Sequence, residues 1–364
     1  MQNNTFGFIG LGLIGGSIAK ALRLAFPECT IIAYDMSVSV MQAAREDVVN
    51  KVYNGIDEAF GTCDIIFLCT PVDFNAGYLK QLKELKKDTC IITDVGSVKK
   101  PIHDMVDKLD LNDCFIGGHP MAGSEHSGYA ASRAELLENA YYILTPGASV
   151  SYTNVEKMQT LIKSIGAIPI VMPQDKHDKV TAAISHLPHM AAYALVNLIE
   201  QSDDEDETMK MIAAGGFKDI TRIASSSAIM WQQICNENKE QLISFMDAYI
   251  GTLSSLRDNI ASGNKEYLLE YFKEAKDYRE SFDDVISGPI KRSYRVAVSI
   301  PDEAGIIAKI SGMFAKDGIN LKNMGIVHNR EFEEGVLRIE FYDETSLKRA
   351  VSILREENYT IFIR

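Results

Sequence analysis

The sequence lacks the features that mark several classes of protein. None of its six cysteines belongs to a C-x-x-C pair, so we expect reduced thiols and neither a disulfide framework nor a zinc site. No apolar run reaches the 18 residues of a membrane-spanning helix, and the first residues lack the basic segment of a signal peptide. We therefore expect a cytoplasmic protein that does not bind a membrane.

Positive charge is also scarce, with 37 Lys and Arg against 50 Asp and Glu and a net charge of −13. An acidic surface repels phosphate backbones, so nucleic acid is not expected as a partner. Hydrophobic residues make up 46% of the chain and charged residues 24%, as in ordinary globular proteins. A length of 364 residues suits two or three domains.

Residues 1–172 alternate short β-branched runs with segments of helical period, such as Leu13–Phe26 and Val155–Ile165. This alternation predicts an α/β domain with a mostly parallel, doubly wound sheet of the Rossmann type. The expected strands are Phe6–Ile9, Thr30–Tyr34, Asp64–Cys69, Cys90–Asp94, Cys114–Gly117, Tyr141–Leu144 and Ile168–Met172.

Residues 173–286 form an all-helical block, with helices expected at Lys176–Glu200, Glu207–Ile223, Ala228–Gly263 and Lys265–Ser281. Such a block buries little apolar surface alone, which favours a homodimer. A turn-rich stretch at Ser287–Pro289 predicts a linker.

Residues 293–364 then show the βαββαβ order of a ferredoxin-like domain. Its strands are expected at Tyr294–Ile300, Asn320–Asn329, Gly335–Phe341 and Tyr359–Ile363, and its helices at Gly305–Asp317 and Ser346–Glu357.

A G-x-G-x-x-G loop follows the first expected strand and opens a helix; its cofactor-binding candidates are Gly10, Gly12, Leu13, Ile14 and Gly15. The glycines permit a tight turn and close approach of a pyrophosphate to the helix N-terminus. Asp35 lies twenty residues after Gly15, where a carboxylate binds a ribose hydroxyl, and so the motif predicts NAD rather than NADP. Thr70 and Pro71 follow another strand at the same sheet edge. The alternative is a glycine turn that binds nothing.

Three further groups could carry chemistry. His119 follows a strand within Gly117–Ser124 and could exchange a proton, or be a structural turn residue. Ser185, His186 and His189 interrupt an apolar helix beside Pro188, as a functional cluster or as a kink with buried, paired histidines. A metal site stays open there, although no H-E-x-x-H motif or nearby third ligand supports it. Arg222 could grip a carboxylate with its forked guanidinium, or form an ordinary salt bridge.

Together these motifs resemble the prephenate dehydrogenase family over about residues 4–285. The resemblance is carried by Gly10–Gly15, Asp94–Lys99, Gly118–Gly123, Ser185–His189 and Gly216–Arg222. The tail, with Ile300–Gly305 and Asp317–Asn320, resembles an ACT domain, a ligand-sensing module. The combination is similar to the tyrosine-pathway enzyme of Gram-positive bacteria.

The resemblance implies oxidative decarboxylation of prephenate by NAD⁺, giving 4-hydroxyphenylpyruvate, CO₂ and NADH. It implies that His119 receives a hydrogen bond or proton from the substrate hydroxyl and that Ser97 positions His119 or the nicotinamide. It assigns substrate binding to Arg222, His189, Ser185, Ser124, Glu125 and His177. The ACT resemblance implies inhibition by L-tyrosine bound near Asp302, Gly305 and Asn320, although a purely structural tail and competition at the active site stay open.

Other functions stay open as well. Arogenate dehydrogenase performs the same chemistry on the amino analogue, which differs in one substituent. A β-hydroxyacid dehydrogenase would need a catalytic lysine where this chain has Ser185–His189. A non-catalytic sensor of NAD and an amino acid would not need His119, Ser97 and Arg222 together.

Overall fold

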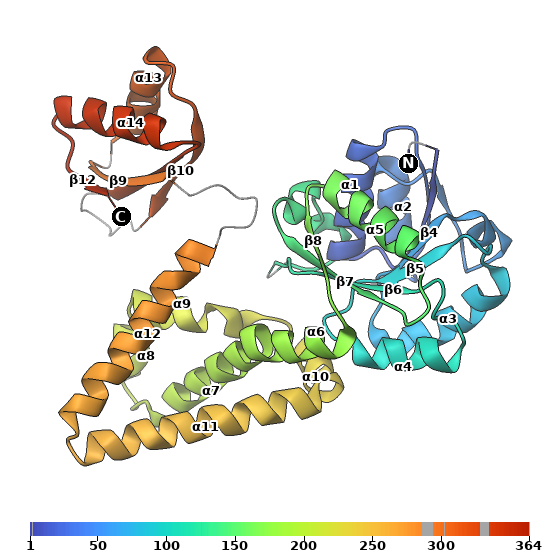
Figure 1. The fold of residues 1–364 in the computed structure, drawn as a ribbon, viewed down its shortest axis with the longest axis horizontal. Coiled ribbons are helices and arrows are strands. Elements are labelled where there is room, and N and C mark those ends of the chain that lie inside the picture. Colours follow the sequence, from blue (N-terminus) through green and yellow to red (C-terminus); the bar gives the residue numbers. More distant parts are fainter. Residues whose placement is uncertain (2, 125, 286–293, 302, 328–334, 364) are drawn as a thin grey trace. The chain divides into compact units, whose positions relative to one another are not determined.

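A computed structural model describes the chain apart from Gln2, Glu125, 286–293, Asp302, 328–334 and Arg364 (Figure 1). The chain divides into two compact units, 1–253 and 254–364, with the boundary inside helix α11 (Lys239–Ala261). Each unit has hydrophobic clusters of its own. The predicted linker at Ser287–Pro289 lies outside the described residues.

The first unit begins with a five-stranded parallel sheet, in the order β3-β2-β1-β4-β5 that characterises Rossmann-type folds. The strands are β1 (Thr5–Ile9), β2 (Thr30–Tyr34), β3 (Lys51–Val52), β4 (Ile65–Leu68) and β5 (Ile91–Asp94). The predicted Rossmann-type domain is thus confirmed. Strand β3 was not predicted, because two residues are too few to show a periodic pattern.

Helices cover both faces of this sheet, since alternate strand residues enter different cores. Phe6 and Phe8 pack with residues of α1 (Leu13–Ala25), α2 (Val38–Asp47) and α5 (Tyr152–Ser164). Ile9 faces the opposite side, with residues of α3 (Val72–Leu85) and α4 (Lys100–Lys108). Short 3₁₀ turns occur at η1 (Glu58–Thr62), η2 (Tyr129–Ala131) and η3 (Ala134–Leu137).

A second, three-stranded sheet follows the first, where the sequence predicts a single, mostly parallel sheet. Its strands are β6 (Ile116–Pro120), β7 (Tyr141–Pro146) and β8 (Ile168–Val171). Strand β6 runs antiparallel to β7, and a single parallel bridge between Ile92 and Phe115 links the two sheets. The alternation of strands and helices does not reveal this reversal, because the described residues between β6 and β7 form only short turns.

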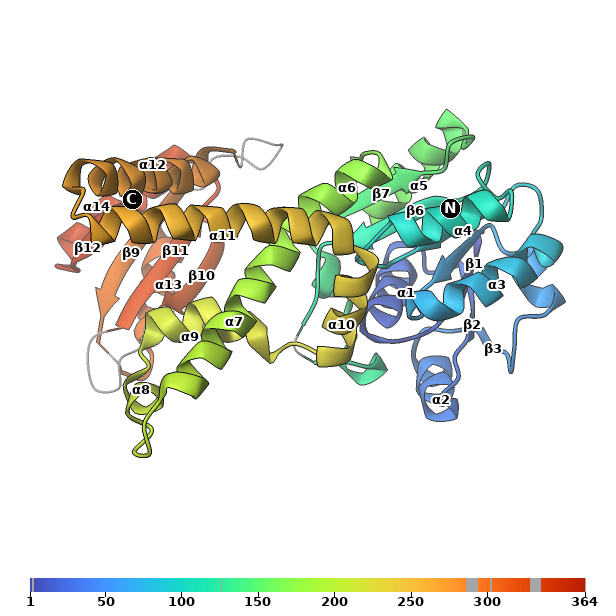
Figure 2. The ribbon, with the colours of Figure 1, turned by 90° about the horizontal axis from the view of Figure 1, so that it is seen from below.

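Helices make up the next part of the chain, as predicted (Figure 2). They are α6 (Gln174–Thr181), α7 (Leu187–Ser202), α8 (Thr208–Ile212), α9 (Gly215–Thr221), α10 (Ala228–Glu237), α11 and α12 (Lys265–Val285), with a 3₁₀ turn η5 (Arg222–Ser225). Two helices that were expected to be continuous are interrupted. The expected helix Glu207–Ile223 is divided into α8, α9 and the start of η5, and the expected helix Ala228–Gly263 is interrupted at Asn238. Between α6 and α7 a π-helical turn, Ala182–His186, precedes Pro188, whose ring nitrogen cannot donate to the carbonyl of Ile184.

The helical stretch Gln174–Ser202 is, by length and composition alone, apolar enough to cross a membrane. An 18-residue window in it has a mean hydropathy of 1.2, and only 17% of that window is buried. Apolar side chains are also exposed on nearby helices, including Ile220, Ile229, Ile243 and Ile250. The helical part therefore has much apolar surface that its own chain does not cover.

The C-terminal segment has the element order βαββαβ. Its elements are β9 (Tyr294–Ile300), α13 (Ile306–Lys316), β10 (Leu321–Val327), β11 (Gly335–Phe341), α14 (Glu344–Glu356) and β12 (Ile361–Ile363). The four strands form an antiparallel sheet in the order β10-β11-β9-β12. Alternate residues of β11 are buried against α13 and α14. The predicted strand Asn320–Asn329 runs past Val327 into residues outside those described.

Candidate active site

The glycine loop joins β1 to α1 and is shaped by backbone crowding. Gly10 has a φ of +91°, and a Cβ there would lie 2.8 Å from the carbonyl oxygen of Cys69. A Cβ on Gly15 would lie 2.6 Å from the carbonyl oxygen of Gly10. Both positions therefore need glycine, for the turn and for close packing of α1 against the sheet.

The loop also has the features that a dinucleotide needs. Nothing lies within 4 Å of a Cβ built on Gly12, and this residue offers no side-chain cap to Leu13 and Ile14 in the first turn of α1. Backbone N–H groups at that end can thus receive a pyrophosphate. The Asp35 carboxylate accepts hydrogen bonds of 2.8 Å from the backbone N–H groups of Leu11 and Ser37, which ties the end of β2 to the loop.

The loop after β4 adjoins the glycine loop. The Thr70 methyl group lies 2.9 Å from the position of a Cβ on Gly10, and the Thr70 hydroxyl donates to Asn75 at 2.8 Å. Pro71 precedes α3 as its N-cap residue. The predicted cofactor residues from three strand ends thus meet at one edge of the sheet, and they fit NAD.

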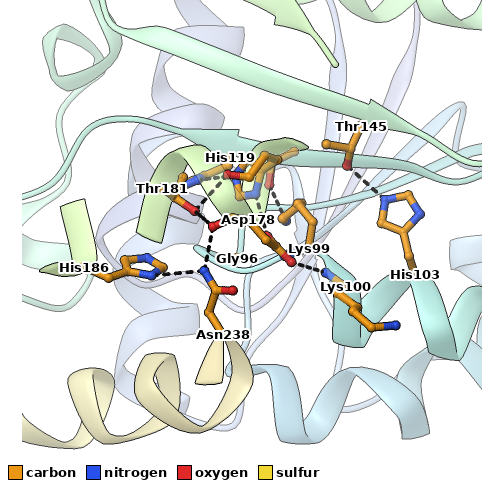
Figure 3. Close-up of polar contacts among 12 residues, drawn as sticks. Gly96, Lys99, Lys100, His103, His119, Thr145, Asp178, Thr181, His186 and Asn238 are labelled. Carbon is orange, nitrogen blue, oxygen red and sulfur yellow. Dashed lines mark hydrogen bonds and ion pairs between the residues drawn. The ribbon is translucent and has the colours of Figure 1, made fainter. Parts of the chain in front are cut away.

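His119 lies on β6 at the start of a buried hydrogen-bonded chain (Figure 3). Its Nδ1 lies 2.8 Å from Nε2 of His177, and Nδ1 of His177 lies 2.7 Å from Oδ1 of Asp178. Asp178 also accepts hydrogen bonds of 2.8 Å from the backbone N–H groups of Lys99 and Lys100, at the start of α4. Helix α6 thereby connects the helical part to the nucleotide-binding sheet.

Burial governs the charge of this chain. Burial, followed by the neighbouring His177, Lys99 and His186, holds the pKa of His119 well below its usual value. Burial likewise lowers the pKa of His177, against the effect of Asp178. For Asp178 burial acts in the raising direction, but the hydrogen bonds from His177 and the two backbone N–H groups lower its pKa overall. At neutral pH Asp178 is a carboxylate and both imidazoles are neutral.

A buried ion pair supports the strand that carries His119. The Lys99 ammonium contacts Oδ2 of Asp94 and donates to the carbonyl oxygen of Gly118 at 2.7 Å, and both charged side chains are fully buried. Asp94 in turn accepts from the backbone N–H groups of Gly96, at 2.9 Å, and Gly118, at 3.1 Å. The pair therefore joins the end of β5 to β6 next to the imidazole.

A second cluster continues from Asp178 into the helical part. The Asn238 amide donates to the Asp178 carbonyl oxygen at 2.8 Å and lies 3.2 Å from Nδ1 of His186. His186 packs edge-on against Trp231, and His189 stacks on the same ring with centroids 3.9 Å apart. Burial lowers the pKa of His189 against the effect of its hydrogen bond to Ser185, and the charge of Arg222 adds to the lowering.

The predicted site residues occupy different surroundings. Ser185 is half-buried, and its carbonyl oxygen lies 2.8 Å from Nδ1 of His189. Ser97 is half-buried in the loop between β5 and α4. Ser124 is exposed and accepts a hydrogen bond from the backbone of His126 rather than joining the imidazoles. Glu125 lies outside the described residues.

His177 corrects an expectation, because it does not line a substrate pocket. It is fully buried, and both ring nitrogens are engaged by His119 and Asp178. Sequence reasoning included Asp94 and Lys99 in a motif without giving either a role, and it missed Asp178 and Asn238. The adjacent letters His-Asp at the start of a predicted helix were the one local signal for Asp178.

A Rossmann-type sheet with a glycine loop, beside a neutral histidine at the junction with a helical part, defines the class as an NAD-dependent oxidoreductase. Family models agree with this class. "Prephenate dehydrogenase, nucleotide-binding domain" matches residues 18–171, and "Prephenate dehydrogenase, dimerization domain" matches residues 173–274.

Individual relatives agree as well. The chain is 38% identical to prephenate dehydrogenase of Bacillus subtilis over 96% of this chain and 95% of the relative. It is 36% identical to cyclohexadienyl dehydrogenase of Zymomonas mobilis over 74% of this chain and 93% of the relative. The Aquifex aeolicus prephenate dehydrogenase structure, in complex with hydroxyphenyl propionate and NAD⁺, matches with a TM-score of 0.71 and 32% identity over 77% of this chain and 98% of that chain.

The chain belongs to the prephenate dehydrogenase family. It is an oxidoreductase that uses NAD in the oxidative decarboxylation of prephenate, a reaction of tyrosine biosynthesis.

Proposed function

We propose that the residues around His119 carry out this reaction, with prephenate as the physiological substrate. The observation that carries the proposal is the place of His119 at the end of β6, beside the end of β5, with its imidazole hydrogen-bonded to His177. NAD⁺, when bound, supplies the hydride acceptor. Gly10, Gly12, Leu13, Ile14, Gly15, Asp35, Thr70 and Pro71 hold it there.

His119 takes the proton of the substrate hydroxyl while the ring carbon that carries this hydroxyl loses a hydride. The bond to the ring carboxylate then breaks, its electron pair completes the aromatic ring, and the oxygen regains the proton from His119. Carbon dioxide leaves, and no net proton is gained or lost. Ser97, in the adjoining loop, positions the imidazole or the nicotinamide.

Arg222 binds a substrate carboxylate, with His189 and Ser185 on the side of the pyruvyl chain. The guanidinium acts on His189, and Trp231 holds the His189 ring by stacking. Prephenate carries two carboxylates, which explains why an acidic chain places an arginine and several histidines together. Ser124, on the loop after β6, is proposed as an outer contact, and so is Glu125, which lies outside the described residues.

Arogenate is the second candidate substrate, because the Synechocystis arogenate dehydrogenase structure matches with a TM-score of 0.69 and 28% identity over 76% of this chain and 99% of that chain. The test is NADH absorbance with NAD⁺ or NADP⁺ and either substrate. We expect a higher kcat/KM with prephenate and NAD⁺; a preference for arogenate would refute the substrate assignment.

The variant His119→Asn tests the role of the base. We expect kcat to fall by about 10²–10⁴-fold with little change in KM, which is the usual effect of losing a general base. A kcat near that of the unaltered enzyme would make His119 a structural residue.

The exposed apolar side chains of the helical part favour a homodimer, because segment 173–274 matches the family's dimerization domain. A second copy of the chain would cover this apolar surface, so the surface does not have to be buried in a membrane. This agrees with a cytoplasmic location. Sedimentation at micromolar concentration should give twice the chain mass of 40.4 kDa. A monomer would refute the assignment.

We further propose that the C-terminal segment is an ACT domain that binds L-tyrosine and lowers activity. A hollow of about 430 Å³, a size typical of small-molecule sites, is lined by Ile300, Pro301, Glu303, Gly305, Ile306, Ile307, Ala308, Ile326 and Gly335. Gly305 is thus part of the hollow. Asn320 is exposed and is not among the lining residues, and Asp302 lies outside the described residues.

The variant Ala308→Phe should fill this hollow and abolish inhibition by tyrosine without changing kcat. Ala315→Phe, on the same helix but away from the hollow, is the control and should keep inhibition. Inhibition that persists in Ala308→Phe, or after removal of residues 290–364, would place the tyrosine site elsewhere.

A further inference from the structure

His119 is connected to its surroundings by one of its two ring nitrogens. Nδ1 contacts His177, whereas Nε2 has no hydrogen-bond partner among the described residues. It is also absent from the buried, unpartnered side-chain atoms of the described chain, which belong to Asn4, Tyr142 and Trp231. Nε2 is therefore the solvent-accessible nitrogen of the His119 ring, and it is the nitrogen that can contact a substrate.

The protonation of a neutral imidazole is decided by what its partners can accept or donate. A carboxylate only accepts hydrogen bonds, so Nδ1 of His177 must carry a proton to donate to Asp178. A neutral His177 then has its lone pair on Nε2, and Nδ1 of His119 must donate to it. The lone pair of His119 is left on Nε2.

The Asp178 carboxylate cannot easily rotate out of this arrangement. Its two oxygens accept the backbone N–H groups of Lys99 and Lys100, and these lie at the N-terminus of α4, where a negative charge is stabilised. Donation therefore converges on the Asp178 carboxylate, from the N–H groups of α4 on one side and from His119 through His177 on the other.

We propose that His177 and Asp178 are positioning residues that fix the tautomer of His119, presenting the Nε2 lone pair to the hydroxyl of the substrate. The inference rests on the proposed role of His119 as the base. When His119 gains the proton, Lys99 opposes the new positive charge and Asp94 is already paired with Lys99; Asp178 is the carboxylate linked to His119 through His177.

Asp178→Asn tests the carboxylate as an acceptor at both oxygens. Oδ1 accepts from His177 and Lys99 and Oδ2 from Lys100, so an amide nitrogen at either place meets a backbone N–H, and the substitution removes the negative charge and disturbs the contact that orients His177. We expect kcat to fall by about 10²–10⁴-fold, with KM for prephenate and NAD⁺ within about threefold, as when an aspartate that orients a catalytic histidine becomes an amide. An unchanged kcat would overturn the proposal.

His177→Gln and His177→Phe separate orientation from packing. The glutamine oxygen can accept from Nδ1 of His119 as the imidazole did, whereas phenylalanine fills the space without accepting. We expect His177→Gln to keep at least about tenfold more kcat than His177→Phe; equal kcat values would contradict an orienting role. His103→Phe is the matched control, because His103 is a buried histidine bonded to Thr145 at 2.9 Å, and its kcat should stay within about threefold.

A direct measurement does not depend on turnover. In the full chain labelled with ¹⁵N-histidine, the ring signals of His119, assigned by their loss in His119→Asn, should show a protonated Nδ1 and an unprotonated Nε2 near neutral pH. The opposite tautomer would overturn the proposal. If the unaltered enzyme reduces NAD⁺ with neither prephenate nor arogenate, the proposed function fails, and the ¹⁵N signals still decide the tautomer.

Discussion

Replacing Lys99 by methionine tests whether the buried ion pair stabilises the first unit. Lys99 and Asp94 are both fully buried, and the lysine also donates to the carbonyl oxygen of Gly118. Methionine keeps most of the volume but removes the charge, so Asp94 keeps only the N–H groups of Gly96 and Gly118. Removing one partner of a buried pair costs about 3–5 kcal/mol, because the other charge stays buried.

This cost sets the size of the measurable effect. For a domain of 150–250 residues, each kcal/mol lowers Tm by about 2–4 °C, so Lys99→Met should lower it by about 6–20 °C. The neighbouring residue provides the control, since Lys100 is exposed and pairs with Asp104 one helical turn away. Lys100→Met should change the free energy of unfolding by less than about 0.5–1 kcal/mol. If thermal unfolding followed by circular dichroism gives the same Tm for both variants, the ion pair does not stabilise this junction.

Three further predictions follow from particular contacts. Gly15→Ala places a Cβ 2.6 Å from the Gly10 carbonyl oxygen and should raise KM for NAD⁺ by about tenfold or more. Gly77→Ala is the control and should leave this KM unchanged, because a Cβ there meets nothing within 4 Å. Arg222→Lys should raise KM for prephenate by about 10–100-fold with a smaller change in kcat, because an ammonium cannot replace a two-pronged contact; an unchanged KM would reject the carboxylate role. Burial lowers the pKa of His186 to about 4, so the unfolded chain binds the proton first and stability falls as pH drops from about 6.5 to 4. His186→Asn should reduce this loss, by at most about 3 kcal/mol, in urea unfolding across that range; an identical pH profile would contradict it.

Much of the fold could be predicted from the sequence, because its strands are short apolar runs between clear turns. The structure has strands at all seven places expected in residues 1–172. What failed was relative direction: β6 is antiparallel to β7, which depends on how the intervening loop packs rather than on local periodicity. The helix breaks at Asn238 and before Arg222 were also not predicted, because the residues there keep a helical pattern.

The site was predictable in part. Gly10, Gly15 and Asp35 stand out because backbone geometry limits the residue types that fit at a dinucleotide loop. Lys99 and Asp178 do not, because charged residues near a helix start are ordinary in a sequence and burial becomes visible only in three dimensions. The ion pair and the imidazole chain are long-range contacts: Asp178 meets Lys99 across 79 positions of sequence.

These long-range contacts have a physical consequence for catalysis. Asp178 lies on the first helix of the helical part. Its carboxylate accepts hydrogen bonds from the N–H groups that begin α4 in the nucleotide-binding part and from Nδ1 of His177. One side chain thus joins the two parts and sets the orientation of the imidazole next to the base. Because hydrogen bonds weaken steeply with distance and angle, a small displacement of α6 against α4 would disturb the base as well as the packing. Substitutions that loosen this junction should therefore lower kcat before they unfold the chain.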